Sequence, residues 1–230
     1  MTVKTERTLL GPKEVAYMQK RIGGLSRAVR LLVFQRPGCE GCGPTAQLAA
    51  EIAAAFPLVQ AETVSDDGGA ASAARLEAFG VERFPALAVT AGDGREPDNG
   101  IRFYGFPGGY EFDSLLDAID RVGRGDAGLS PELADYLGTA GAAPMHLQVF
   151  ITPTCPYCPR MVQLAHRMAL ASPRVTADMI DAVEFPDLAD RYGVRGVPLT
   201  VVDESIFVEG GVPEQQLLRE LRERRTPGRL

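Results

Sequence analysis

The sequence predicts an α/β protein made of two similar units, and three observations lead to this class. The chain has 230 residues, enough for two domains of the common size of about 100–150 residues. Its four cysteines form two Cys-x-x-Cys pairs, Cys39/Cys42 and Cys155/Cys158, which lie about half the chain apart. The pattern of apolar and turn residues around the first pair recurs around the second pair.

The elements next to the cysteines have counterparts in both halves. "VRLLVF" (29–34) and "MHLQVFI" (145–151) are apolar runs rich in branched residues, which predicts a buried strand ahead of each pair. Behind the cysteines, "TAQLAAEIAAAF" (45–56) and "RMVQLAHRMALA" (160–171) have the apolar and alanine positions of helices. Each half therefore presents its cysteine pair between a strand and a helix.

The downstream parts of the two halves also match. "LEAFGVERFPALAVT" (76–90) and "LADRYGVRGVPLTVVD" (188–203) each predict the end of a helix, a Gly-Val turn, an X-Pro step and a strand. A further strand, a glycine turn and a closing helix follow in each half. A helix is expected ahead of each unit, at residues 12–22 and 130–137. The main mismatch is "AGDGREPDNG" (91–100), which predicts a longer polar hairpin turn in the first half.

The boundary between the units is expected in the glycine-rich stretch "GRGDAGLSP" (123–131). We expect one domain over residues 1–124 and a second over residues 125–230. The first domain carries Cys39-Glu40-Gly41-Cys42, and the second carries Cys155-Pro156-Tyr157-Cys158.

Composition and charge narrow the function classes. The net charge is −6, and the one dense basic run, Arg222–Arg225, is typical of a solvated helix end, so neither a nucleic-acid nor a membrane-surface partner is indicated. The N-terminus has no apolar signal-peptide core and no window approaches the length of a membrane span, which predicts a cytoplasmic location. Disulfides do not normally persist there as structure, so the paired cysteines are interpreted as redox-active. A four-thiolate metal site and inert buried thiols remain as alternatives.

The motifs resemble those of a known family. The order of elements is similar to the thioredoxin fold, and "TCPYC" (154–158) resembles the glutaredoxin active site. Two fused units of this kind, each with a Cys-x-x-Cys, resemble the protein disulfide oxidoreductases of thermophilic prokaryotes, a glutaredoxin-like family, over nearly the whole chain. The resemblance implies two tandem thioredoxin-like domains, each a central mixed β-sheet flanked by helices. It also implies dithiol–disulfide exchange with protein substrates: reduction, oxidation and, in some members, isomerisation.

The cysteines suit this chemistry by their position. Exchange needs a thiolate, a resolving thiol and access for the partner. Cys155 and Cys39 are expected at helix N-termini, where the helix dipole favours a thiolate. Cys158 and Cys42 are then one helical turn further along, more buried, and act as the resolving thiols. No bound cofactor and no metal are expected, because the cysteines themselves carry the electrons.

Further site residues and partners follow from the resemblance. It implies that Pro85 and Pro198 are cis-prolines facing the cysteine pairs, and that the preceding Phe84 and Val197 pair with an extended substrate. Tyr157 and Pro156, between the second cysteines, are expected to contact substrate as well. A flavoprotein of the thioredoxin-reductase kind is the implied electron source. The alternative from a different class is a non-redox binding or chaperone module that uses the same cleft.

The charges around the two pairs predict different pKa values for the two attacking thiols. Glu40 disfavours a thiolate at the first pair, whereas Arg36 and Arg160 favour one. We therefore expect Cys155 to have the lower pKa and the second site to carry most of the substrate chemistry. Thioredoxins carry a buried acid six residues before the first cysteine. Val33 and Val149 stand at those positions here, so that proton acceptor is not expected.

Overall fold

The computed structural model describes residues 8–92, 100–139 and 144–225. In the first half the elements follow in the order α1 (Pro12–Ile22), β1 (Val29–Gln35), α2 (Cys42–Ala55), β2 (Val59–Ser65), α3 (Ala70–Ala78), β3 (Ala86–Ala91), β4 (Ile101–Tyr104), a 3-10 turn η1 (Gly109–Glu111) and α4 (Phe112–Arg124). In the second half the order is α5 (Pro131–Thr139), β5 (Met145–Ile151), α6 (Cys158–Ala171), β6 (Val175–Asp181), α7 (Pro186–Arg191), β7 (Leu199–Val202), β8 (Ile206–Glu209) and α8 (Glu214–Arg224).

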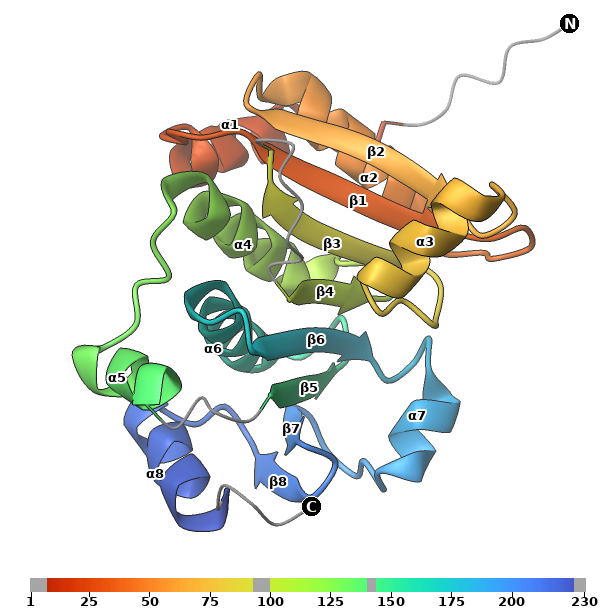
Figure 1. Ribbon diagram of the computed structural model, residues 1–230. Helices are drawn as coiled ribbons and strands as arrows, with labels where there is room; N and C mark the ends of the chain where they lie inside the picture. The colour runs from red at the N-terminus through yellow and green to blue at the C-terminus, as the bar shows by residue number, and fades with distance from the viewer. Residues whose placement is uncertain (1–7, 93–99, 140–143, 226–230) are drawn as a thin grey trace, which may run out of the picture.

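The strands of the described residues form one continuous eight-stranded mixed sheet (Figure 1). Its strand order is β2-β1-β3-β4-β6-β5-β7-β8, so each half of the chain contributes four neighbouring strands. The two halves join where β4 pairs with β6 in parallel, in the register Ile101↔Ala177 to Tyr104↔Ile180. This pairing satisfies the backbone N–H and C=O groups that β4 and β6 would otherwise expose as sheet edges.

Strand direction brings both cysteine pairs to one edge of the sheet. β1, β4, β6 and β5 run parallel to one another, while β3 and β7 run antiparallel to them. β1 and β5 lead directly to the cysteine pairs, so both pairs lie at the carboxyl ends of these strands. Four strand spacings separate β1 from β5 in the sheet order, roughly 19 Å at the usual strand separation.

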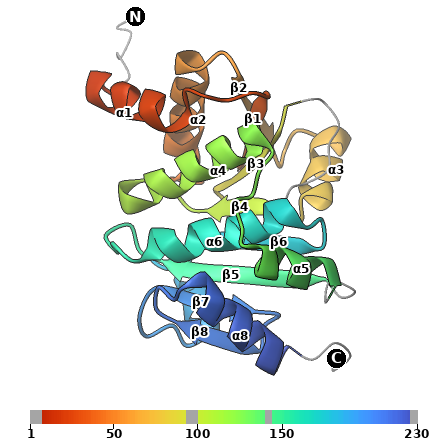
Figure 2. The ribbon, with the colours of Figure 1, turned by 90° about the vertical axis from the view of Figure 1, so that its left-hand side faces the viewer.

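The helices cover the two faces of the sheet unequally. α1, α2, α4, α5, α6 and α8 bury their apolar side chains in one large core, whereas α3 and α7 pack against a smaller core on the opposite face. Figure 2 shows α1, α4, α6 and α8 stacked on the face of the sheet that carries the larger core. α4 packs against α6 there, which brings the two halves together through helices as well as strands.

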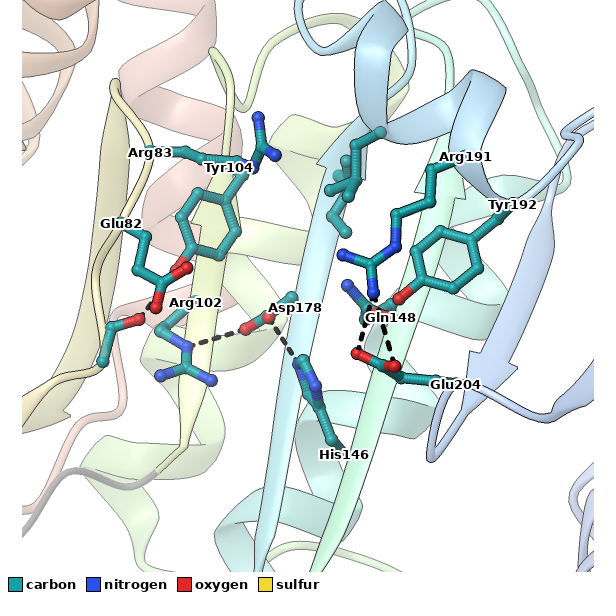
Figure 3. Close-up of a pocket in the computed structure, with 13 residues that line it drawn as sticks. Glu82, Arg83, Arg102, Tyr104, His146, Gln148, Asp178, Arg191, Tyr192 and Glu204 are labelled. Atoms are coloured by element: carbon teal, nitrogen blue, oxygen red, sulfur yellow. Dashed lines mark hydrogen bonds and ion pairs between the residues drawn. The ribbon is translucent and has the colours of Figure 1, made fainter.

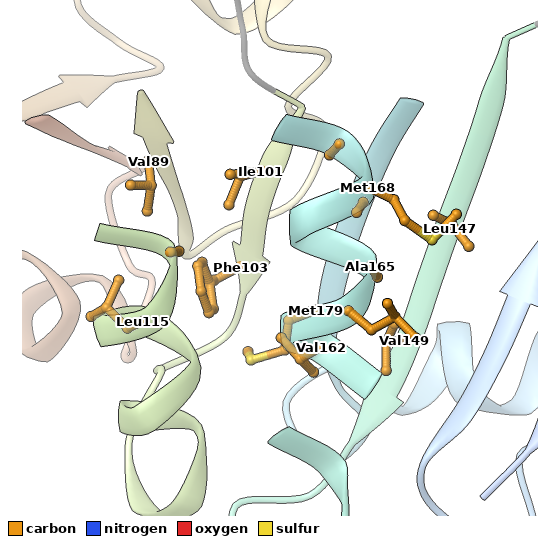
Figure 4. Close-up of a cluster of buried hydrophobic side chains, with 14 of the residues drawn as sticks. Val89, Ile101, Phe103, Leu115, Leu147, Val149, Val162, Ala165, Met168 and Met179 are labelled. Carbon is orange, nitrogen blue, oxygen red and sulfur yellow. The ribbon is translucent and has the colours of Figure 1, made fainter. Parts of the chain in front are cut away.

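The larger core is continuous across the two halves (Figure 4). Phe103 and Leu115 of the first half lie in the same buried cluster as Val162 and Met168 of the second half. Arg167 of α6 adds a bidentate ion pair to Asp117 of α4, with N–O distances of 3.0 and 2.8 Å. The two halves therefore share one hydrophobic interior.

The predicted α/β class is confirmed, with small differences at element ends. The strand predicted over 145–151 matches β5, and β1 extends one residue beyond 34. Both cysteine helices begin before the first residue that the apolar pattern suggested, at Cys42 and Cys158. Their first turns contain Pro44 and Pro159, which fit there because the first N–H groups of a helix have no intrahelical partner. Most of the hairpin turn predicted over 91–100 lies outside the described residues.

No helix in the part of the chain that the structure describes combines the length and the apolar character that crossing a membrane requires.

Candidate active site

Each Cys-x-x-Cys pair forms a disulfide at the start of a helix. Cys39 is bonded to Cys42 with a Cα–Cα distance of 5.4 Å, and Cys155 is bonded to Cys158 with a Cα–Cα distance of 5.6 Å. Cys42 and Cys158 are the first residues of α2 and α6. Cys39 and Cys155 lie in the turn just before these helices, so all four sulfurs are near a helix N-terminus, where negative charge is favoured.

Within each pair one cysteine is more shielded than the other. Cys42 is 4% exposed and Cys158 is 0% exposed. Cys39 is partly exposed, and Cys155 is 7% exposed. This difference suits an attacking thiol that a substrate reaches and a resolving thiol behind it.

The first disulfide lies in an open cleft of 770 Å³. Cys39, Phe84 and Pro85 line this cleft, together with the charged Arg36 and Glu184. The guanidinium carbon of Arg36 lies 5.2 Å from the centre of the Phe84 ring, a cation–π distance. Glu184 comes from the loop after β6, in the second half of the chain.

The second disulfide has an exposed aromatic neighbour. Tyr157, between the two cysteines, is 71% exposed, and Pro156 beside it is also exposed. The Cys155 Sγ lies 3.8 Å from the Val197 carbonyl oxygen. In the disulfide this sulfur has no hydrogen to donate, but a reduced thiol at that position has an acceptor beside it.

The X-Pro steps lie next to the disulfides in both halves. The Phe84-Pro85 and Val197-Pro198 peptide bonds are both cis. In each case the proline is buried and the preceding residue is partly exposed. The cysteines and X-Pro steps that the sequence pattern grouped are therefore side by side at each site.

Three acids that no sequence motif indicated lie between the two sites. Glu111 lies on η1, after β4, whereas Asp181 ends β6 and Glu184 follows it. The charge of Asp181 acts on both glutamates and raises the pKa of each, after burial as the larger cause. Because β4 and β6 are adjacent parallel strands, their following loops meet at the edge where the disulfides lie. Only the β4–β6 pairing brings these acids together.

Glu111 is the most perturbed of the three. Its side chain is 1% exposed, and burial raises its pKa from 4.5 to about 7. The Ser114 hydroxyl donates a hydrogen bond of 2.5 Å to Oε2, while Oε1 has no protein partner among the described residues. η1 contacts α6, and the Tyr110 N–H donates to the Pro153 carbonyl just ahead of Cys155. A carboxyl group that titrates near neutrality therefore lies beside the second site.

Replacing Glu111 with Gln is expected to stabilise the oxidised protein at pH 8 but not at pH 4. The folded pKa of about 7 lies above the ordinary value of 4.5, so ionising this carboxyl costs stability as the pH rises from about 4.5 to 7. The variant avoids that cost, and we expect its free energy of unfolding at pH 8 to rise by about 2 kcal/mol. Urea unfolding at both pH values measures it. The exposed Glu132→Gln is the control, and an equal effect of Glu111→Gln at both pH values contradicts the prediction.

The two histidines have structural positions. His166 is buried; its Nε2 donates to the Arg102 carbonyl at 3.2 Å, and its ring packs edge-on against Phe103. Burial lowers its pKa to about 4. His146 bonds to Asp178 on the sheet face opposite α6. Neither histidine lines the cleft at the first disulfide.

The separation of the two pairs excludes one interpretation of the cysteines, a metal site shared by all four thiolates. Each pair closes within itself, and four strand spacings lie between the strands that carry them. The thiolates of a zinc site all lie about 2.3 Å from the ion, so these four cannot hold one ion in this fold. The same separation prevents direct disulfide exchange between the two sites in this conformation.

Comparison with known proteins agrees with this fold and site. A thioredoxin domain model matches residues 145–223, which include the second disulfide. The alkyl hydroperoxide reductase protein AhpF of Staphylococcus epidermidis is 32% identical over 142 residues, covering 61% of this chain and 27% of the relative. The chain thus matches about a quarter of the length of its curated relatives.

Two solved structures match most of the chain. The AhpF protein of Enterococcus faecalis superposes with a TM-score of 0.82 at 25% identity, covering 92% of this chain and 99% of that one. A protein disulfide oxidoreductase from Aeropyrum pernix gives a TM-score of 0.80 at 26% identity, covering 91% and 90%. In this chain the doubled thioredoxin fold has a disulfide at the start of one helix in each half, and the chain is similar over most of its length to a protein disulfide oxidoreductase.

Proposed function

We propose that this chain is a protein dithiol–disulfide oxidoreductase that exchanges disulfides with protein substrates at both Cys-x-x-Cys sites. The observation that carries the proposal is the paired geometry of each site. One cysteine is more exposed, its partner is shielded at the first position of a helix, and an X-Pro segment lies alongside. We assign the sites to two domains, residues 1–124 and 125–230, and the protein to the cytoplasm.

The reaction at the second site runs in two steps. The Cys155 thiolate attacks one sulfur of a substrate disulfide, forming a mixed disulfide and releasing one substrate thiolate. The Cys158 thiol then loses its proton and attacks the Cys155 sulfur, which closes the Cys155–Cys158 disulfide and releases the second substrate thiolate. Two electrons pass from the dithiol to the substrate. We assign the Cys158 proton to Glu111, because the η1 turn that carries it packs against α6, its Oε1 has no protein partner among the described residues, and its pKa is raised to about 7.

Substrate contacts are assigned to the residues around each attacking sulfur. At the second site these are Tyr157 and Pro156, which are exposed, and the Val197-Pro198 step, whose Val197 carbonyl oxygen is 3.8 Å from the Cys155 sulfur. At the first site Phe84-Pro85 has the matching position in the cleft. An extended peptide that lies along either X-Pro segment brings its disulfide to the accessible sulfur.

The two sites are assigned different roles. Glu40 and Glu184 both lie at the first site, and negative charge there disfavours the thiolate form. A destabilised thiolate makes the dithiol more reducing, so we assign electron entry to the first site, from a flavoprotein of the thioredoxin-reductase kind. The second site then faces the substrates. Because the sites lie too far apart to exchange directly, transfer between them requires a partner or a second copy of the chain.

Peroxide reduction is a second candidate for the pathway this chain serves. It is favoured by the similarity to the alkyl hydroperoxide reductase protein of Staphylococcus epidermidis, which extends over 61% of this chain. In that case the substrate disulfide belongs to a peroxide-reducing protein rather than to a range of client proteins.

A disulfide-reduction assay tests the proposal. The protein is expected to accelerate the reduction of insulin by dithiothreitol, and a variant with all four cysteines replaced by serine is expected to give the uncatalysed rate. Suppression of aggregation of a cysteine-free client is the comparison for the chaperone alternative. If the four-serine variant keeps the full activity of the wild type in the insulin assay, redox function is refuted.

A further inference from the structure

We infer that Glu184, on the second half of the chain, is the proton-accepting residue of the first disulfide site, Cys39–Cys42. This inference rests on the proposed function and adds a residue to its first site. The first half has Val33 at the position six residues before Cys39, so it supplies no acid from β1. The carboxylate comes instead from the loop after β6, which the β4–β6 pairing carries to the mouth of the first cleft.

One oxygen of the Glu184 carboxylate is held by a hydrogen bond, and the other approaches the turn between the cysteines. Oε1 accepts a hydrogen bond of 2.7 Å from the Phe106 N–H. Oε2 points at the turn between the cysteines, where a Cβ built on Gly41 would lie only 2.8 Å from it. That Cβ would also lie 2.9 Å from the Pro85 ring. The carboxylate, the cysteine turn and the cis-proline therefore meet at one point.

Two glycines make room for this carboxylate. A side chain at Gly41 would displace the Glu184 carboxylate and press against the Pro85 ring. Gly105, with φ of 103°, lies on the other side, where a Cβ would come within 2.8 Å of Asp181 and 3.2 Å of Oε1. Gly105 thus has both a backbone conformation that other residues rarely adopt and a close neighbour. The glutamate is seated between the two halves of the chain.

The position of Glu184 beside the cysteine turn suits it to accept a proton during disulfide exchange. After Cys39 attacks a substrate disulfide, Cys42 must lose its proton before it can attack the mixed disulfide. Glu184 takes that proton, the Cys42 thiolate attacks the Cys39 sulfur, and the departing substrate thiolate receives the proton in turn. Burial raises the pKa of Glu184 toward the working range, with the Phe106 hydrogen bond opposing it. The dithiol loses two electrons to the substrate, and the carboxylate is regenerated.

The test isolates the first site in the full-length chain. In a Cys155→Ser/Cys158→Ser background, the reduced protein reacts with the aromatic disulfide 5,5′-dithiobis(2-nitrobenzoate) and releases two coloured thiolates. The first release reports the attack by Cys39 and the second reports the attack by Cys42. Adding Glu184→Gln keeps an oxygen for the Phe106 N–H but removes the proton acceptor. At pH 7 we expect the second release to slow about tenfold, a modest loss for a general base replaced by water.

The pH dependence separates proton transfer from a structural effect. With Glu184 present, the rate of the second release is expected to rise at a lower pH than it does in Glu184→Gln, because the carboxylate accepts the Cys42 proton. In Glu184→Gln its midpoint should move toward the free-thiol pKa of about 8.5. Asp187→Asn, an exposed acid of the same segment paired with Arg83, is the matched control and should leave both releases unchanged. An unchanged second release in Glu184→Gln, or an equal slowing in Asp187→Asn, overturns the inference.

The Glu184 test and the insulin assay can fail independently of each other. Because the small disulfide needs no protein substrate, the Glu184 effect is measured whether or not insulin is reduced. Failure of the insulin assay with a normal Glu184 effect refutes only the proposed substrate class. Loss of the Glu184 effect with normal insulin reduction refutes only the proton acceptor.

Discussion

Replacing Cys155 with serine is expected to lower insulin reduction more than replacing Cys39 with serine does. The second site has the exposed Tyr157 beside it and Glu111 with a pKa of about 7. The first site has Glu40 and Glu184, whose charges oppose a thiolate at Cys39. We expect a loss of about 100-fold for any site that loses its nucleophile. In the whole protein, Cys155→Ser should leave only the slower activity of the first site.

Titration of the two thiols shows whether Cys155 forms a thiolate more readily than Cys39. The rate of alkylation by iodoacetamide is measured against pH in the two single-site proteins, Cys39→Ser/Cys42→Ser and Cys155→Ser/Cys158→Ser. Cys155 is expected to have the lower pKa. The double variant Cys39→Ser/Cys155→Ser is the control and should fall to the uncatalysed rate of insulin reduction. A lower pKa at Cys39, or a larger loss in Cys39→Ser than in Cys155→Ser, is inconsistent with the roles assigned here.

Replacing Asp178 with Asn is expected to destabilise the whole chain by about 3–5 kcal/mol, as the loss of one partner from a buried ion pair generally does. Asp178 on β6 accepts a hydrogen bond of 2.7 Å from Arg102 on β4 and one of 2.6 Å from His146 on β5 (Figure 3). Both Arg102 and Asp178 are buried. The substitution removes the carboxylate that pairs with the buried Arg102 charge, in the strand pair that joins the two halves.

The effect on stability has a defined pH dependence. Although burial opposes it, attraction to Arg102 and His146 lowers the pKa of Asp178 below 3.8. A depressed pKa means that this carboxylate contributes stability above about pH 3.8 and that the contribution is lost as the pH falls through the folded pKa. The free energy of unfolding of Asp178→Asn should therefore fall below that of the wild type by the whole expected amount at pH 7, and by less in strong acid. Urea unfolding at pH 7 and at pH 3 measures it.

Two variants make this test specific. Arg102→Met/Asp178→Leu replaces the pair by apolar side chains and is expected to regain most of the lost stability, because no buried charge is left unpaired. Asp187→Asn breaks the exposed pair with Arg83, which has an N–O distance of 2.7 Å, and should change stability little because water screens it. A double variant as unstable as Asp178→Asn would show that the charge imbalance is not the cause.

The sequence by itself determined the repeat and the chemistry of each unit. Strand, Cys-x-x-Cys and helix follow one another within about 30 residues in each half, so local patterns of apolar, glycine and proline residues suffice to predict them. The X-Pro steps were recognised in the same way, by matched placement in the two halves. The disulfides form within these local segments, which is why the four cysteines could be grouped into two redox pairs from the sequence.

The tertiary structure decided how the two units combine. The pairing of β4 with β6 builds one sheet, buries Arg102 against Asp178 and sends the loop of each half toward the disulfide of the other. Glu111 and Glu184 belong to these loops, and each is distant in sequence from the cysteines it approaches in space. Their positions depend on strand pairing and burial, which leave no local pattern in the sequence, so the roles proposed for them come from the folded chain alone.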